Sequence, residues 1–147
     1  MSLTDLTRFI RNIPDFPVPG VLFRDITPLL AEPVALHEAV VRMADPFRGR
    51  GITDVVGVEA RGFVFGVLVA QQLTAGFVPI RKAGKLPAAT IRNEYELEYG
   101  RASLEIHRDA FAARPEPAVL LVDDVLATGG TAVAAIDLVR RAGGRVV

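Results

Sequence analysis

One segment of the sequence is informative about both fold and ligand: Leu120-Leu-Val-Asp-Asp-Val-Leu-Ala-Thr-Gly-Gly-Thr131. The apolar run from Ala118 to Val122 has the length and the β-branched content of a buried strand. A glycine turn follows the strand, and a helical pattern runs from Thr131 to Ala142. A strand, a turn and a helix in this order are typical of an open α/β sheet, in which ligands bind where the strands end.

The glycine turn has the composition of a phosphate site. In Thr128-Gly-Gly-Thr131, the glycines let the backbone approach an anion closely, and the hydroxyls and the helix N-terminus supply donors. Asp123 and Asp124 cannot bind phosphate, because they are negative themselves, but they suit the vicinal hydroxyls of a sugar. The segment therefore predicts a ribose 5-phosphate site rather than an ordinary strand, turn and helix. It lacks the lysine of a nucleoside-triphosphatase loop and the glycine pattern of a dinucleotide fold.

The composition is typical of one neutral domain, residues 1–147. Hydrophobic residues make up 50% of the chain, and 17 Lys and Arg residues balance 17 Asp and Glu residues, without the basic excess of a nucleic-acid-binding protein. There is no cysteine, which excludes disulfides and thiolate chemistry. The longest apolar stretch, Gly62 to Ala70, is too short to cross a bilayer. We therefore expect a cytoplasmic protein that binds neither nucleic acid nor membrane.

Alternating strand and helix patterns predict an α/β fold with a doubly wound, mainly parallel sheet and flanking helices. Pro79, within one of the strands, predicts an edge position or a missing ladder bond. The polar segment 81–101 shows no sustained period, so we expect a flexible functional loop there. The expected strands are 53–58, 76–80, 102–107 and 118–122, and the expected helices include 61–73 and 131–142.

The N-terminal third is less regular. An apolar stripe predicts a helix over 2–12, and three prolines and a glycine predict an irregular segment over 13–20. Pro33 suits the first turn of a further helix. The face of that helix expected to be buried consists of Leu36, Val40, Met43 and Phe47.

The C-terminus predicts an unfinished sheet. Gly143-Gly144 ends the last helix, and Arg145-Val-Val147 has the composition of the first residues of another strand. A parallel strand should follow a crossover helix. We therefore expect the last strand to be missing and the chain to be C-terminally shortened.

Four further segments, spread over nearly the whole chain, are informative when taken with the turn at Asp123–Thr131. They are Ile13-Pro-Asp-Phe-Pro-Val-Pro-Gly-Val-Leu-Phe-Arg-Asp-Ile-Thr-Pro28, Glu59-Ala-Arg-Gly-Phe63, Arg81-Lys-Ala-Gly-Lys-Leu-Pro87 and Tyr95-Glu-Leu-Glu-Tyr-Gly100. The turn resembles the loop that binds 5-phosphoribosyl 1-diphosphate (PRPP) throughout the type I phosphoribosyltransferase superfamily. With the four segments, the chain resembles the adenine phosphoribosyltransferases of that superfamily, and the first and last segments are the ones that point to adenine.

The resemblance implies the reaction of purine salvage, in which adenine and PRPP give AMP and pyrophosphate with Mg²⁺. It also implies a homodimer, an N-terminal base-binding hood at about 1–32 and an active-site loop at about 81–101. Mg²⁺ would be held mainly through PRPP, with Asp123 or Asp124 contributing through water. The residues expected to bind PRPP or AMP are Asp123, Asp124, Ala127, Thr128, Gly129, Gly130, Thr131, Arg61, Arg81, Lys82, Lys85 and Tyr99.

Catalysis and adenine binding are assigned by resemblance alone. Glu98 is expected to accept the adenine N9 proton or to stabilise the sugar cation. Without the resemblance, the sequence does not distinguish Glu98 from Glu94 and Glu96 for this role. Adenine is expected to stack on Phe23 and to meet the backbone of Leu22 and Arg24.

Three alternatives stay open from the sequence. One is a phosphoribosyltransferase for hypoxanthine, guanine or xanthine. Another is a non-catalytic PRPP sensor, although the segment before Ile13 is too short for a winged helix. The last is a truncated chain that binds PRPP with little activity.

Overall fold

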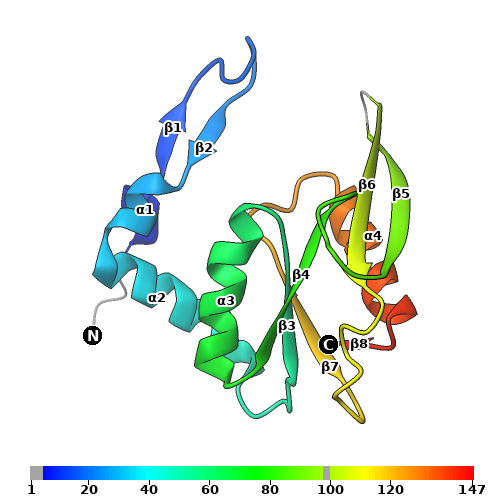
Figure 1. Cartoon of the computed structure of the whole chain (residues 1–147). Coiled ribbons are helices and arrows are strands. Elements are labelled where there is room, and N and C mark those ends of the chain that lie inside the picture. The colour runs from blue at the N-terminus through cyan, green and yellow to red at the C-terminus, as the bar shows by residue number, and fades with distance from the viewer. Residues whose placement is uncertain (1–4, 98–99) are drawn as a thin grey trace. The chain divides into compact units, whose positions relative to one another are not determined.

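Six strands form one sheet within residues Phe47–Val147, in the order β5-β6-β4-β3-β7-β8 (Figure 1). The computed structural model describes residues 5–97 and 100–147, and the chain divides into this unit and a smaller one, Met1–Pro46. The strands are β3 (Asp54–Val58), β4 (Gly76–Lys82), β5 (Thr90–Leu97), β6 (Gly100–His107), β7 (Ala118–Val122) and β8 (Arg145–Val146).

The centre of the sheet is parallel, as predicted. β3 pairs in parallel with β4 on one side and with β7 on the other, and β7 pairs in parallel with β8. Every residue of β3 is buried, which explains its continuous apolar run. The predicted α/β fold is therefore confirmed, and the β5–β6 hairpin makes the complete sheet mixed.

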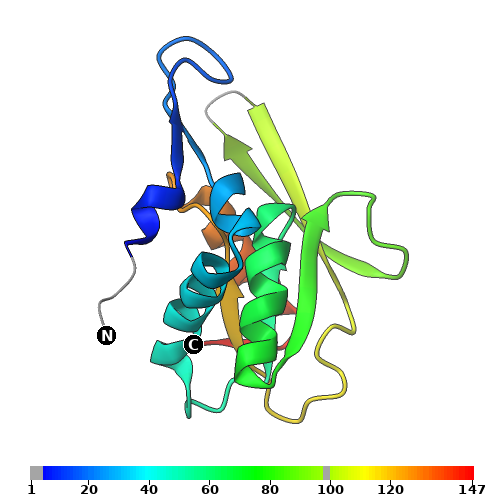
Figure 2. The same ribbon diagram turned by 90° about the vertical axis from the view of Figure 1, so that its left-hand side faces the viewer.

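Helices cover both faces of the sheet. α3 (Arg61–Leu73) and α4 (Gly130–Arg141) lie on opposite sides of it in Figure 1, and Figure 2 shows α3 running alongside β4. α3 approaches β3 closely because glycines meet there: a Cβ added at Gly57 would lie 2.6 Å from the carbonyl oxygen of Gly62. α4 buries Leu138 in the core beneath the other face. Both helices match their predicted ranges closely.

The prediction of a loop over residues 81–101 is wrong for most of that range. β4 continues through Lys82, β5 occupies Thr90–Leu97, and β6 begins at Gly100, so among the described residues of this range the irregular ones are 83–89. The strand pattern was hidden because Ile91, Asn93 and Tyr95 are only half-buried, while the alternating residues between them are charged and exposed.

Pro79 and the C-terminus illustrate incomplete ladders. Pro79 lies opposite Gly57 of β3, whereas β6 pairs with β4 only at Arg81 and Lys82, so Pro79 has no strand partner on that side. This is the missing ladder bond that the sequence predicts. The residues expected to begin a further strand do so as β8, a two-residue strand whose Arg145 and Val146 pair in parallel with β7. The strand has no more than these residues, as the sequence predicts.

The smaller unit contains less helix than predicted. A helix is predicted over 2–12; from residue 5, where the described chain begins, there is a 3₁₀ turn instead, η1 (Leu6–Phe9), capped by the Asp5 side chain, which accepts from the Thr7 N–H. β1 (Arg11–Ile13) follows and pairs antiparallel with β2 (Phe23–Asp25). The proline-rich segment between these strands is irregular, as expected.

Two helices complete the smaller unit, α1 (Thr27–Ala31) and α2 (Pro33–Ala44), with Pro33 in the first turn of α2 as predicted. A short 3₁₀ turn, η2 (Asp45–Phe47), follows α2. The predicted buried stripe is wrong except at Val40, because the helix buries its small side chains, which permit the closest packing. The buried residues are Ala35, Ala39, Val40 and Ala44.

Candidate active site

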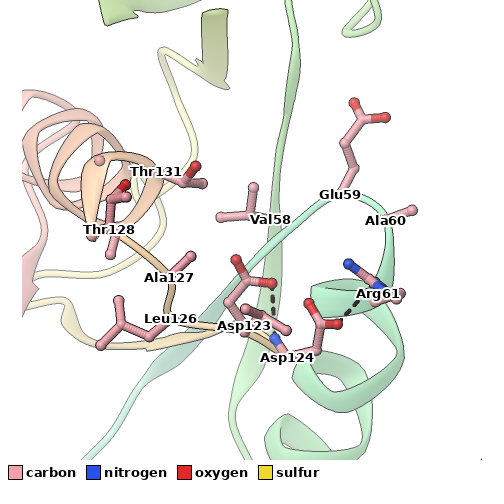
Figure 3. A pocket seen from close by; sticks show the side chains of 14 residues that line it. Val58, Glu59, Ala60, Arg61, Asp123, Asp124, Leu126, Ala127, Thr128 and Thr131 are labelled. Atoms are coloured by element: carbon pink, nitrogen blue, oxygen red, sulfur yellow. Dashed lines mark hydrogen bonds and ion pairs between the residues drawn. The ribbon is translucent and has the colours of Figure 1, made fainter. Parts of the chain in front are cut away.

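A cavity of about 270 Å³ opens where β3 and β7 end. Because these strands are parallel neighbours, their carboxyl ends and the turns that follow lie at the same edge of the sheet. The cavity is lined by the two turns, Val58–Arg61 and Asp123–Ala132 (Figure 3). It therefore brings together all the predicted PRPP-binding residues of the glycine turn and Arg61.

The turn after β7 presents backbone groups to the cavity. Gly129 adopts a φ of +89°, which glycine tolerates without strain, and α4 begins at the next residue. The first N–H groups of a helix have no partner within the helix, so they are free to meet an anion. The hydroxyls of Thr128 and Thr131 lie at the same helix start (Figure 3). This arrangement can bind a phosphate group.

Asp123 and Asp124 lie between Arg61 and residues Ala127–Thr131, which we call the phosphate turn. The backbone N–H of Asp124 donates to Asp123 Oδ1 at 2.8 Å, and Asp124 Oδ2 lies 2.8 Å from Arg61 Nε (Figure 3). The Asp124 side chain is only 8% exposed, so the arginine compensates a carboxylate that water reaches poorly. Gly62 leaves room for this arrangement, since a Cβ there would lie 3.0 Å from Asp123 Oδ1.

The environment of Asp123 disfavours its ionised form. Loss of hydrating water raises the pKa of this carboxyl to about 6, and the neighbouring Asp124 carboxylate acts in the same direction. A ligand that offers hydroxyl donors or positive charge would relieve this effect. Asp123 is therefore suited to bind sugar hydroxyls or a cation.

The turn after β3 is short and charged. Only Glu59 and Ala60 separate β3 from α3, and their peptide bond is cis. Glu59 Oε1 accepts from the backbone N–H of Lys82 at 2.6 Å and lies 3.3 Å from Arg81 Nε. Glu59 thus fixes the end of β4 beside the cavity. The sequence did not single out Glu59, although its place at a strand end, two residues before Arg61, was a usable signal.

Three predicted basic residues are not among those that line the cavity. Arg81 contacts Glu59 instead, and Lys82 meets Glu59 through its backbone N–H. Lys85 lies in the irregular segment after β4, where its carbonyl oxygen lies 3.5 Å from Arg81 Nη1.

The predicted adenine-binding residues belong to the smaller unit. The ring of Phe23 packs edge-on against Phe16, with 5.1 Å between centroids. Arg24 Nη1 donates to Asn12 Oδ1 at 2.6 Å, and half of Leu22 is exposed.

The predicted catalytic residue Glu98 and its neighbour Tyr99 lie outside the described residues. The two competing glutamates, Glu94 and Glu96, are exposed on β5. They line a separate cavity of about 230 Å³ together with Arg101.

A second contact that the sequence did not indicate joins the hairpin to the phosphate turn. The phenol oxygen of Tyr95, on β5, lies 3.1 Å from Thr131 Oγ1. The alternation of half-buried and exposed residues along β5 was the signal that could have placed Tyr95 on the inner face of a strand.

The described residues contain no group of three or more His, Asp or Glu side chains that could hold a metal ion. Three carboxylates line the cavity, Glu59, Asp123 and Asp124, and Mg²⁺ commonly binds through one or two carboxylates completed by substrate phosphates. The donor set therefore fits a Mg²⁺ ion that arrives with a phosphorylated ligand. Within residues 5–97 and 100–147, no helix has the length and apolar character needed to span a membrane.

The sequence and structure were compared with known proteins. Residues 47–147 match the model of the phosphoribosyl transferase domain family. Adenine phosphoribosyltransferase of Thermobifida fusca is 58% identical over 144 residues, covering 98% of this chain and 81% of the relative. The crystal structure of adenine phosphoribosyltransferase from Rhodothermus marinus matches with a TM-score of 0.89 and 53% identity, covering 97% of this chain and 80% of that one.

A further solved structure carries ligands. It is the Saccharomyces cerevisiae adenine phosphoribosyltransferase in complex with adenine and an imino-altritol bisphosphate. It matches with a TM-score of 0.89 and 37% identity, covering 97% of this chain and 82% of that one.

Proposed function

This chain belongs to the adenine phosphoribosyltransferase family, and we propose that it makes AMP and pyrophosphate from adenine and PRPP with the residues assigned below. The observation that carries the assignment is the cavity of about 270 Å³, in which a glycine and threonine turn, two carboxylates and Arg61 meet. These are the groups needed for a 5′-phosphate, a ribose diol and a pyrophosphate.

The turn after β7 is assigned to the ribose 5-phosphate. The 5′-phosphate would receive hydrogen bonds from the N–H groups of the first turn of α4 and from the threonine hydroxyls. Asp123 and Asp124 would accept hydrogen bonds from the ribose hydroxyls, which would favour the ionised form of Asp123. The residues assigned to the 5′-phosphate are Ala127, Thr128, Gly129, Gly130 and Thr131.

The pyrophosphate group is assigned to the turn after β3. Arg61, at the start of α3, combines a guanidinium with the N-terminal end of a helix, and both favour an anion. Arg81, Lys82 and Lys85 complete the set if the segment after β4 closes over the ligand. Tyr99 is assigned to PRPP as well. A Mg²⁺ ion held by PRPP, with Asp123 or Asp124 through water, would neutralise charge on the departing pyrophosphate.

Catalysis requires one further acid. Cleavage of the C1′–O bond places positive charge on the ribose, so a carboxylate near the sugar lowers the barrier, and a base must take the N9 proton of adenine. We assign to Glu98 one of these tasks, either acceptance of the N9 proton or stabilisation of the ribose cation. Phe23 would stack on adenine, and backbone groups of Leu22 and Arg24 would read its edge, within the base-binding segment 1–32.

The assembly and the location belong to the same proposal. Arg81 from one subunit would reach the site of its partner, which makes a homodimer the active form. Residues 1–147 would act as one domain. PRPP is too highly charged to cross a membrane unaided, so the enzyme must work in the compartment that makes PRPP, which we take to be the cytoplasm.

A substrate panel tests the proposal. Formation of pyrophosphate and of the matching nucleoside monophosphate is followed with PRPP and Mg²⁺, and adenine is compared with hypoxanthine, guanine and xanthine. We expect adenine to react at least about a hundredfold faster than the others. A faster reaction with another purine would show that this purine, rather than adenine, is the preferred substrate. Binding of PRPP without turnover of any purine would identify a sensor.

Matched glutamate variants test the catalytic assignment. Glu98→Gln should lower kcat at least about a hundredfold with little change in PRPP affinity. Glu94→Gln and Glu96→Gln are the controls on the same hairpin. A larger loss of kcat in either control would assign the catalytic role to that glutamate instead of Glu98.

A further inference from the structure

Tyr95 lies where β5 meets the first turn of α4, and the proposed function leaves it without a role. Its phenol oxygen lies 3.1 Å from Thr131 Oγ1. Its ring is so close to the phosphate turn that a Cβ added at Gly130 would lie 3.8 Å from it. The ring also packs against the core that contains Leu138 of α4. Packing therefore fixes the ring, and the ring fixes the hydroxyl beside Thr131.

The chemistry of the two hydroxyls gives this contact a direction. Either oxygen can be the donor in the structure as it stands. A phosphate dianion offers only acceptors, so Thr131 must donate its single hydrogen to the phosphate. When phosphate is bound, only one donor remains for the hydrogen bond between the two hydroxyls: the Tyr95 O–H donates to Thr131 Oγ1. Hydrogen bonds in such a chain polarise and strengthen one another.

Other contacts hold β5 on α4 away from the phosphate turn. Asn93 Nδ2 donates to Asp137 Oδ2 at 2.7 Å, and Arg141 Nη1 donates to the carbonyl oxygen of Arg92 at 2.9 Å. These bonds lie on later turns of the helix. Attachment of the hairpin can therefore be weakened without touching Thr131, which separates a general structural role of β5 from a specific effect on the phosphate turn.

We propose that Tyr95 is a positioning residue for the 5′-phosphate, because its hydroxyl orients the Thr131 hydroxyl toward the phosphate oxygens. The inference rests on the proposed function, since it requires a 5′-phosphorylated ribose in this cavity. It adds a residue from the hairpin to a site otherwise built from two strand-to-helix turns. Its effect should be confined to ligands that carry the 5′-phosphate.

A double-mutant cycle tests the proposal through the Kd of ribose 5-phosphate, measured by titration calorimetry. Tyr95→Phe, which keeps the ring, should weaken binding about fivefold to tenfold. Thr131→Val should weaken it at least as much, and the double variant should bind no more weakly than Thr131→Val alone. Unchanged binding by Tyr95→Phe, or a full additional loss in the double variant, overturns the proposal.

Two controls make the result specific. Asn93→Ala should lower the unfolding temperature but leave the Kd of ribose 5-phosphate unchanged, and Tyr95→Phe should leave the Kd of pyrophosphate unchanged. Equal weakening by Asn93→Ala would show that β5 acts only through stability. If the wild-type chain makes AMP but Tyr95→Phe binds ribose 5-phosphate normally, this inference alone fails. If the wild-type chain does not bind ribose 5-phosphate, both the inference and the proposed function fail.

Discussion

The two turns that line the cavity follow neighbouring parallel strands and precede helices, yet they present different chemistry. After β3, only Glu59 and Ala60 separate the strand from α3. After β7, residues 123–129 separate the strand from α4, and Gly129 has a positive φ. The first turn presents charged side chains. The second presents backbone N–H groups, hydroxyls and two carboxylates.

This difference shows how one sheet edge can hold two unlike parts of a ligand. The short turn has no glycine loop to wrap round an anion, so the Arg61 guanidinium adds charge to what the N-terminal end of α3 offers. A long turn with glycine can surround a phosphate with its own N–H groups. The ion pair of Arg61 with Asp124, at 2.8 Å, joins the two turns across the cavity.

The largest effect should come from Gly129→Val, which distorts the backbone of the longer turn, residues 123–129. A β-branched residue at a φ of +89° is strained, and the N–H groups would lose their alignment. We expect the Kd of ribose 5-phosphate to rise about a hundredfold. Titration calorimetry measures it. Gly143→Val is the matched control, because Gly143 has a φ of +96° after α4, away from the cavity. Equal loss of affinity in both variants would refute a local role.

Arg61→Ala should remove the charge of the shorter turn. We expect pyrophosphate to bind about tenfold to thirtyfold more weakly, with a smaller effect on ribose 5-phosphate. Arg141→Ala removes an arginine that pairs with Asp137 at 3.1 Å on α4 and serves as the control. An equal loss for both ligands would mean that Arg61 acts through Asp124 alone.

Much of this comparison could be predicted from the sequence, because it depends on local patterns. The expected strand Ala118–Val122 coincides with β7, and the expected helix 61–73 coincides with α3. β7 is an apolar run bounded by residues that suit a turn, and α3 follows closely on such a run, so neighbouring residues suffice to identify them. The glycine and threonine composition of the longer turn indicated a phosphate for the same reason.

What the sequence left open depends on contacts between distant segments. The pairing of Arg61 with Asp124, and of Glu59 with Arg81, follows from the register of the sheet, which no local pattern contains. The strand predicted over 102–107 is confirmed as part of β6, whereas β5 falls within the range expected to be a loop because it is only half-buried. The buried face of α2 was misassigned because alanines, rather than the largest apolar side chains, occupy it.

Glu59→Gln should have a moderate effect, because Glu59 supports the shorter turn indirectly. It holds Arg81 and the backbone of Lys82, so its loss should raise the KM for PRPP about fivefold without lowering kcat. Steady-state kinetics measure both constants. Glu38→Gln, in a half-buried pair with Arg42 on α2, is the control. A fall in kcat with an unchanged KM would place Glu59 in the chemistry instead.

The smallest effect should be a pH dependence of stability that comes from Asp123. Because its folded pKa, about 6, is above the ordinary value of 3.8, the folded chain retains a proton that the unfolded chain has lost between these pH values. The contribution is complete below about pH 4 and is lost as the pH rises through about 6. It should amount to less than about 1 kcal/mol, since the side chain is partly exposed.

The difference in unfolding free energy between wild type and Asp123→Asn, measured by urea denaturation, isolates this contribution. Other carboxyls cancel in the difference. We expect the unfolding free energy of the wild type, minus that of the variant, to decrease from pH 4 to pH 6 in the absence of ligand. A difference that rises with pH would contradict the direction of the Asp123 shift.

Competition between ligand fragments tests most directly whether the two turns form one site with two parts. Ribose 5-phosphate should occupy the turn after β7, and pyrophosphate, with Mg²⁺, the turn after β3. Calorimetric titration of each fragment in the presence of the other, and of PRPP in the presence of each, measures this. The account predicts that the fragments bind together while each one displaces PRPP. Mutual exclusion of ribose 5-phosphate and pyrophosphate would contradict it.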